Sequence, residues 1–288
     1  MSTTPTSTTP TSTSEAAVVR LAVAQTTTRT DPADGAAFRA AGVEIRELMT
    51  QAHDQRADLV LFPEATFCFP DKRALSRTAP ELGEADWTRF DWATLTDELE
   101  LVRQHARSLA LWTVIGTQTR GAEARPRTSL LVIDAEGEDH IRYDERRLSR
   151  TKDTVMYARG DGPAVFELNG LRFGLASGLE VLFDDIFLAY EDDGVDAVLF
   201  ATQGPPNPEE SDGLATSARA AARHHQLTVG FSAPVSHAPY VPSGVVGPDG
   251  RWMASCRARA TPDVVTVEVT SRPEGAARAW RRSMVAAD

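Results

Sequence analysis

The stretch LRFGLASGLEVLFDD, residues 171–185, decides the fold that we predict for this chain. Its apolar first half ends abruptly in small residues, and an acidic segment typical of a helix start follows. This is the pattern of a buried strand that passes through a tight turn into a helix. Such elbows commonly hold a catalytic nucleophile. Here, however, the turn reads Ala176, Ser177, Gly178, Leu179 and Glu180, without a cysteine.

On both sides of this stretch, short apolar runs alternate with segments of helical periodicity, in which apolar residues recur at three- and four-residue steps. The runs predict strands over residues 16–25, 58–62, 111–118, 128–134, 140–146, 164–168, 171–177, 196–200, 227–232, 244–247, 250–256 and 263–269. The periodic segments predict helices over 38–52, 95–109, 184–192 and 211–225. This alternation favours one α/β domain over residues 16–270, with helices outside packed sheets.

Composition and charge limit the partners that we expect. The 288 residues include 41 acidic and 30 basic ones, and the net charge of −11 repels nucleic acid and anionic membranes. Residues 1–15 form a Thr/Ser/Pro-rich segment that we predict to be a disordered tail rather than a secretory signal. Residues 271–288 are predicted to be a C-terminal arm or tail. No apolar run approaches the ~18 residues of a membrane span, so we expect a cytoplasmic protein.

Cysteine and lysine are both rare in this chain. Cys68 and Cys256 are too few and too far apart for a disulfide framework or a thiolate metal site, and we predict partly buried thiols. Lys72 and Lys152 are the only lysines, so a mechanism that needs a titratable amine has two side-chain candidates. We expect no cofactor and assign no metal ligands.

Several segments resemble, in the same order, those of the nitrilase or carbon-nitrogen hydrolase superfamily. They are LFPE at 61–64, YDERRL at 143–148, GDGP at 160–163, the elbow at 174–180, ARAAAR at 218–223 and SGVVGPDG at 243–250. The resemblance implies a four-layer αββα sandwich that forms a homodimer or a higher homo-oligomer. It also implies a triad of glutamate as general base, lysine as oxyanion stabiliser and cysteine as nucleophile.

Two of the three triad positions depart from this family pattern. The glutamate falls on Glu64 and is kept. The lysine position falls on Glu145, and the cysteine position falls on Gly178, with Gly174 before it and Glu180 in the acidic position after it. The resemblance therefore implies a degenerate site that lacks a nucleophile.

Two nearby residues are candidates to replace the missing groups. Ser177 precedes the elbow position, but adjacent strand residues point to opposite faces, which favours a small packed side chain over a nucleophile. Lys152 lies in a segment that the resemblance places near the site, with Asp153 near the place of an auxiliary family glutamate. It is a possible surrogate ammonium, although a lone lysine in a polar loop is usually solvated.

Three carboxylates are expected to converge if the fold is right: Glu64, Glu145 and Glu180. Carboxylates at close range cannot all ionise cheaply, so one should take up a proton or recruit a cation. One hypothesis is therefore a site for a cationic small molecule or a divalent metal. Alternatively, Glu145 pairs with a neighbouring arginine at 146, 147 or 150 and faces solvent, and Glu180 caps the following helix.

The long segment 65–92 contains proline and aromatic residues, and it reads as a loop of the kind that often covers a site. Trp87, Trp92 and the segment 67–70, including Phe67, are expected either to line the pocket mouth or to form the packing core of the loop. His224 and His225 end a predicted helix, where a positive charge is favourable.

Two classes of function follow from this pattern. The first is a non-hydrolytic homologue, or pseudoenzyme, that binds a small molecule or a protein partner. The second is an enzyme of altered chemistry on an amide, amine or related substrate, with Glu64 and Glu145 as an acid/base pair and no thioester intermediate.

Overall fold

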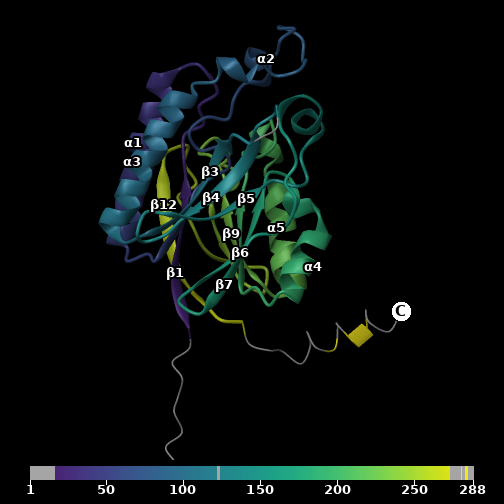
Figure 1. Ribbon diagram of the computed structural model, residues 1–288. Coiled ribbons are helices and arrows are strands. Elements are labelled where there is room, and N and C mark those ends of the chain that lie inside the picture. Colours follow the sequence, from purple (N-terminus) through teal and green to yellow (C-terminus); the bar gives the residue numbers. More distant parts are fainter. Residues whose placement is uncertain (1–16, 122–123, 273–279, 281–282, 285–288) are drawn as a thin grey trace, which may run out of the picture.

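The structure is a computed structural model that describes residues 17–121, 124–272, 280 and 283–284 (Figure 1). The predicted tail at residues 1–15 lies outside the described residues, as does most of the predicted arm at 271–288. Within the described part of the chain, no helix is long and apolar enough to cross a membrane.

The described strands form two six-stranded sheets. The first has the order β12-β1-β2-β3-β4-β5, with β1 (Val18–Gln25), β2 (Leu59–Leu61), β3 (Trp112–Thr119), β4 (Arg127–Ile133), β5 (Asp139–Asp144) and β12 (Asp263–Thr270). The second has the order β11-β10-β9-β8-β7-β6, with β6 (Val165–Leu168), β7 (Leu171–Ser177), β8 (Ala197–Ala201), β9 (Thr228–Ser232), β10 (Gly244–Val246) and β11 (Trp252–Ser255).

Helices cover the outer face of each sheet (Figure 1). The first sheet packs against α1 (Gly35–Asp54) and α3 (Trp92–Leu109), and the second against α4 (Asp184–Asp192) and α5 (Asp212–His225). Shorter helical elements are α2 (Lys72–Leu75), η1 (Trp87–Arg89), η2 (Lys152–Met156), η3 (Glu180–Leu182) and η4 (Pro208–Glu210). The layers therefore run α, β, β, α, which confirms the predicted sandwich.

Side chains alternate between two cores along the strands of the first sheet. In β1, Ala22 and Ala24 pack under the helices, whereas Leu21 and Val23 pack between the two sheets. The period of two follows from strand geometry, in which successive side chains point to opposite faces. Because both faces of β1 and β2 are largely buried, the sequences of these two strands are almost wholly apolar.

The predicted helices and strands are found close to their expected bounds. Segment 184–192 coincides with α4, and the hairpin at Asn169 and Gly170 joins β6 to β7 through two residues with positive φ. Segment 65–92 is less irregular than expected, because it contains α2 and η1 and begins α3. Each of these three elements starts after an aspartate whose side chain accepts hydrogen bonds from backbone N–H groups at the helix start.

Candidate functional site

Glu64 follows β2 at a sharp turn of the chain. The next residue, Ala65, has a φ of 46°, a left-handed conformation that is costly for a residue with a Cβ atom. The turn packs directly on β3, where a Cβ atom added to Gly116 would lie 2.6 Å from the Cα atom of Glu64. The Thr66 N–H donates to the Gly116 carbonyl at 2.8 Å and fixes this approach. Glu64 is therefore held on a constrained backbone, and 3% of its side chain is exposed.

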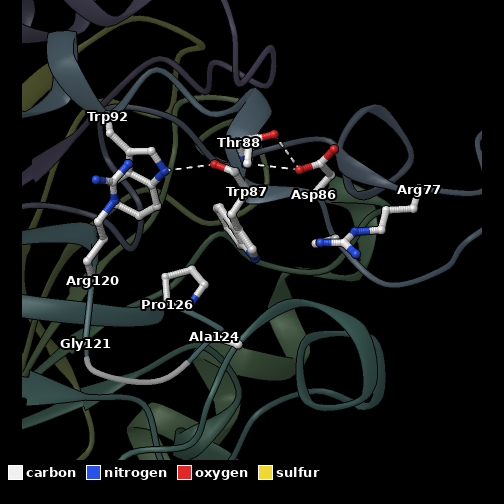
Figure 2. Close-up of a pocket in the computed structure, with 10 residues that line it drawn as sticks. Arg77, Asp86, Trp87, Thr88, Trp92, Arg120, Gly121, Ala124 and Pro126 are labelled. Atoms are coloured by element: carbon white, nitrogen blue, oxygen red, sulfur yellow. Dashed lines mark hydrogen bonds between the residues drawn. The ribbon is translucent and has the colours of Figure 1, made fainter.

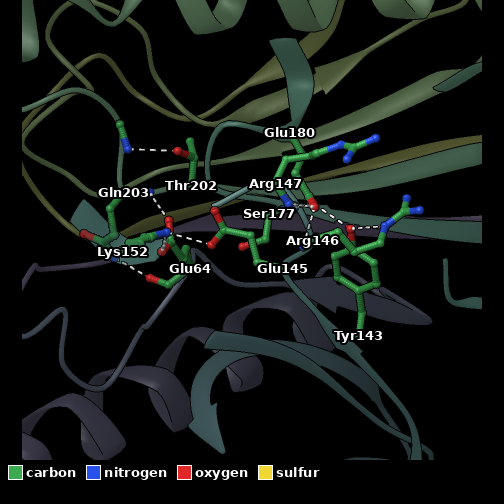
Figure 3. Close-up of polar contacts among 11 residues, drawn as sticks. Glu64, Tyr143, Glu145, Arg146, Arg147, Lys152, Ser177, Glu180, Thr202 and Gln203 are labelled. Atoms are coloured by element: carbon green, nitrogen blue, oxygen red, sulfur yellow. Dashed lines mark hydrogen bonds and ion pairs between the residues drawn. The ribbon is translucent and has the colours of Figure 1, made fainter. Parts of the chain in front are cut away.

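Lys152 lies between Glu64 and Glu145, as Figure 3 shows. Its Nζ donates to Oε1 of Glu64 and, at 2.7 Å, to Oε2 of Glu145. The exposed fractions of the Lys152 and Glu145 side chains are 6% and 0%. The lysine is carried by η2, a π-helical turn, which is a rare backbone form that is frequent at functional sites. We call these three residues the buried ion triad.

Gln203 holds Glu64 from the opposite sheet. Its backbone N–H donates to Oε2 of Glu64 at 3.2 Å, and its side-chain amide donates to the Glu64 carbonyl. Gln203 follows the end of β8, so the contact joins the carboxyl ends of β2 and β8 across the two sheets. Both carboxylate oxygens of Glu64 are therefore occupied by donors.

Burial and the neighbouring charges act in opposite directions on the triad. Burial raises the pKa of Glu145 to about 8, against the attraction of Lys152 and with the repulsion of Glu64 added to it. Burial lowers the pKa of Lys152, but the attraction of Glu145 and Glu64 outweighs it and raises that pKa above its usual range. We conclude that Lys152 is an ammonium group and that burial favours the protonated form of Glu145.

Gly178 lies directly against the carboxylate of Glu145. A Cβ atom added to Gly178 would lie 2.2 Å from Oε1 and 2.6 Å from the carboxyl carbon of Glu145. Its φ is 65°, in the left-handed region, and its N–H donates to the Ala201 carbonyl at 2.9 Å. The glycine is therefore required by the backbone and by the space that Glu145 fills.

Glu180 belongs to a second hydrogen-bond network, with Tyr143, Arg146, Arg147 and Ser177 (Figure 3). It accepts hydrogen bonds from the Tyr143 hydroxyl at 2.6 Å and from the Ser177 N–H at 2.8 Å. The N–H groups of Arg146 and Arg147 donate to its other oxygen at 2.7 and 3.1 Å. Burial raises the pKa of Glu180, while these hydrogen bonds act to lower it. The carboxylate joins the end of β5 to the elbow after β7.

The remaining candidate nucleophiles are all buried. Cys68 donates to the Asp31 carbonyl at 3.6 Å, and burial raises its pKa to about 12. Cys256 donates to the Val23 carbonyl at 3.4 Å, and burial raises its pKa as well. The Ser177 side chain is buried, and its Oγ has no hydrogen-bond partner among the described residues. A cysteine acts as a nucleophile when it is a thiolate, and a serine does so when a base lies next to it.

The structure corrects several details of the sequence-based expectations. Glu145 pairs with Lys152 and is buried, so it does not face solvent with a neighbouring arginine. Lys152 is buried rather than solvated, whereas Asp153 turns outward and pairs with Arg159. Glu180 neither joins the triad nor caps α4, since Phe183 is the N-cap residue of that helix.

Residues expected at a pocket mouth divide into two groups. Phe67 is fully buried in the core between the first sheet and its helices. Trp87 and Trp92 pack on that same core and also line a pocket of about 290 Å³ (Figure 2). His225, at the end of α5, lies between Glu191 and Asp184, with a distance of 2.9 Å from a ring nitrogen to each carboxylate.

Gln203 is the residue of this site that the sequence pattern did not single out. The available signal was its place two residues after an apolar strand, next to Gly204 and the proline-rich segment 205–208. Among the described residues, no group of three or more His, Cys, Asp and Glu side chains is arranged to hold a metal ion.

The fold and the site place the chain in a known class of proteins. A sequence model of the carbon-nitrogen hydrolase family matches residues 20–279. The chain therefore belongs to the carbon-nitrogen hydrolase family, within the nitrilase superfamily. A comparison with curated protein sequences found no match.

Solved structures of this superfamily share the fold at low sequence identity. An amidase from Nesterenkonia sp. AN1, in complex with acrylamide, is 18% identical with a TM-score of 0.73, over 94% of this chain and 97% of that one. Another structure of the amidase, 19% identical, has a TM-score of 0.72 over 93% and 95% of the two chains. It carries the acetamide moiety of fluoroacetamide on its active-site cysteine. The C. elegans NitFhit protein is 20% identical with a TM-score of 0.70, over 94% of this chain and 64% of that protein.

Proposed function

We propose that this chain is a non-hydrolytic member of the carbon-nitrogen hydrolase family that acts by binding a small molecule or a protein partner. The observation that carries the proposal is the contact between Gly178 and Glu145. The resemblance assigns the nucleophilic cysteine to position 178, and a side chain there would overlap the Glu145 carboxylate. The two departures from the family pattern are therefore coupled: the glutamate at the lysine position fills the space of the missing nucleophile.

An exchange of charges explains how the site stays folded without the family lysine. The resemblance expects a cation at position 145 and an auxiliary anion near position 153. The chain has Glu145 and Lys152 instead, and Lys152 supplies Glu64 with its ammonium partner. The exchange keeps Lys152 paired with both buried glutamates, but it provides no nucleophile.

The same geometry bears on the hypothesis of a cationic ligand. Lys152 already occupies the space between the two carboxylates, so an external amine or metal ion would have to displace a buried ammonium group. We therefore do not place the small-molecule ligand between Glu64 and Glu145.

The second candidate function is an enzyme of altered chemistry. Two observations favour it: the pKa of Glu145 is raised to about 8 by burial, and its Oε1 has no hydrogen-bond partner among the described residues. A carboxyl group that titrates near neutral pH is suited to general acid–base catalysis. This function would need no covalent intermediate, and it predicts turnover that Glu145→Gln abolishes.

Covalent labelling tests the non-hydrolytic proposal. We expect intact-mass spectrometry of the chain after incubation with fluoroacetamide, amides, nitriles and N-carbamoyl compounds to show no adduct, together with no release of ammonia. An acyl or acetamide adduct on any residue would overturn the proposal. Ammonia release without an adduct, abolished by Glu145→Gln, would favour the second candidate.

A reconstructed site provides the matched positive control. In the variant with Gly178→Cys, Glu145→Lys and Lys152→Glu, the first two substitutions restore the cysteine and the lysine at the positions that the resemblance assigns, and the third keeps the balance of charges in the buried ion triad. We expect this variant to be labelled by fluoroacetamide, whereas Gly178→Cys alone stays unlabelled because the Glu145 carboxylate obstructs the new side chain. Labelling of Gly178→Cys alone at the reconstructed rate would show that Glu145 does not block the site.

A further inference from the structure

We propose that the pocket lined by residues of segment 77–92 and by residues 120, 121, 124 and 126 binds a small planar anion, such as an aromatic carboxylate (Figure 2). This inference rests on the proposed binding function and names a place and a ligand class for it. The pocket has a volume of about 290 Å³, close to the lower end of the ~300–1,000 Å³ range of ligand pockets, which suits a ligand of about one ring.

Two indole rings form much of the aromatic lining of the pocket. Trp87 and Trp92 are both half-buried, and their ring centroids lie 6.0 Å apart with an angle of 47° between the planes. The indole N–H of Trp87 donates to the Met156 carbonyl, and that of Trp92 donates to the Trp87 carbonyl, each at 2.9 Å. Because both indole N–H groups already donate within the protein, the two tryptophans offer ring surface rather than donors. Ring surface favours stacking with a planar apolar group.

The polar part of the lining carries an excess of positive charge. Arg77 and Arg120 are exposed, and the guanidinium carbon of Arg120 lies 4.4 Å from the centroid of the Trp92 ring. The lining carboxylate, Asp86, accepts hydrogen bonds from the N–H and the hydroxyl of Thr88, which lower its pKa. Asp86 also pairs with Arg89 at 3.5 Å, so its negative charge already has a cationic partner three residues away.

These features select a planar anion over other small molecules. A guanidinium group binds a carboxylate through two parallel hydrogen bonds, and its stacking on an indole leaves its N–H edges directed to the side. The net charge of −11 opposes anion binding at long range. The attraction therefore has to come from the two arginines at short range, and it should weaken with salt because both arginines are exposed to solvent.

The pocket is separate from the buried ion triad, although η2 contacts both. The Trp87 ring contacts Tyr157 at a centroid distance of 5.1 Å, and Tyr157 is itself buried just after η2. None of the three triad side chains lines the pocket. Conservative substitutions in the triad should therefore leave ligand binding in the pocket unchanged.

Titration of the full chain with three probes tests this proposal. Benzoate has the ring and the charge, benzamide has the ring alone, and acetate has the charge alone. The chain has five tryptophans, so its indole N–H signals in a nitrogen–proton correlation spectrum are few enough to assign by single Trp→Phe variants. We expect benzoate to shift the signals of Trp87 and Trp92 and to bind about tenfold more tightly than benzamide or acetate.

Matched variants connect the binding to the named arginines. Arg120→Met should weaken benzoate binding about tenfold, whereas Arg251→Met, at an arginine that is 86% exposed and absent from the pocket lining, should leave it unchanged. Equal binding of benzoate and benzamide, equal effects of the two variants, or no shift of the two indole signals would overturn the proposal. None of these results would change the outcome of covalent labelling with fluoroacetamide. The pocket proposal and the non-hydrolytic proposal can therefore fail independently of each other.

Discussion

Glu145 and Glu180 are two buried carboxylates near the same elbow, and they differ in the number of hydrogen bonds that each accepts. Glu180 receives four hydrogen bonds, three of them from backbone N–H groups, and both its oxygens are occupied. Glu145 receives one, from Lys152, and its Oε1 has no partner among the described residues. Glu180 is therefore held by the backbone around it, whereas Glu145 occupies the space beside Gly178 with one oxygen that has no hydrogen-bond partner among the described residues.

The difference has an energetic consequence. A buried carboxylate with all its hydrogen bonds made can stabilise the loops that it joins, whereas an incompletely bonded one is costly unless it takes up a proton. Burial raises the pKa of both groups, but only Glu180 has several donors that oppose the shift. We therefore expect Glu180 to act as a fixed structural anion and Glu145 to respond to pH and to its lysine partner.

The largest expected effect is that of Lys152→Met, because it leaves the carboxylates of Glu64 and Glu145 buried without a cation. Breaking a buried ion pair on one side costs ~3–5 kcal/mol in the free energy of unfolding. Urea denaturation at neutral pH measures this loss. The control is Arg251→Met, which removes a cation whose side chain is 86% exposed and lies outside the triad. An equally small loss in both variants would show that the triad does not stabilise the fold.

Glu180→Gln should have the next largest effect. An amide keeps one acceptor oxygen and places an NH₂ group against N–H and O–H donors, which leaves buried donors unpaired and costs ~2–3 kcal/mol. Glu167→Gln, at an exposed position of β6, should change stability by less than ~0.5 kcal/mol. Chemical denaturation of both variants distinguishes them, and similar values would contradict a structural role for Glu180.

Glu145→Gln should have the smallest effect at neutral pH, within ~1 kcal/mol, because glutamine resembles the protonated acid that burial favours. Its signature lies in the pH dependence. The pKa of Glu145 is raised from 4.5 to about 8 on folding. Its contribution to stability is therefore fully present below pH 4.5 and is lost as the pH rises through about 8, since the unfolded chain releases this proton first.

Stability measurements between about pH 6 and about pH 8 test the sign of this dependence. Relative to Glu145→Gln, the unsubstituted chain should lose up to ~1.4 kcal/mol per pH unit in this window. Parallel pH profiles would mean that Glu145 is ionised in the folded protein.

The fold could be predicted from the sequence because its signals are local. Apolar runs and helical periodicity mark the strands and helices, as in segment 184–192, which coincides with α4. The resemblance also located Glu64 and the elbow at Gly178 next to the ends of strands. These features depend on neighbouring residues and on segment order, both of which are visible in one sequence.

The contacts within the site could not be predicted because they join distant residues. Lys152 reads as a solvated loop lysine until η2 turns it toward Glu64, a residue 88 positions away. The bond between Tyr143 and Glu180 spans 37 positions, and neither residue alone indicates its partner. Rarity was the available clue, since a chain with two lysines has few ways to supply an ammonium group.

The most direct test of the contact between Glu145 and Gly178 is a double-mutant cycle in the free energy of unfolding. Gly178→Ala should cost ~1–2 kcal/mol for the left-handed backbone and a further ~1–3 kcal/mol for the overlap with the carboxylate. In a Glu145→Ala background the overlap is removed, so we expect Gly178→Ala to cost ~1–3 kcal/mol less there. Additivity of the two substitutions within ~0.5 kcal/mol would contradict a glutamate in the place of the missing nucleophile.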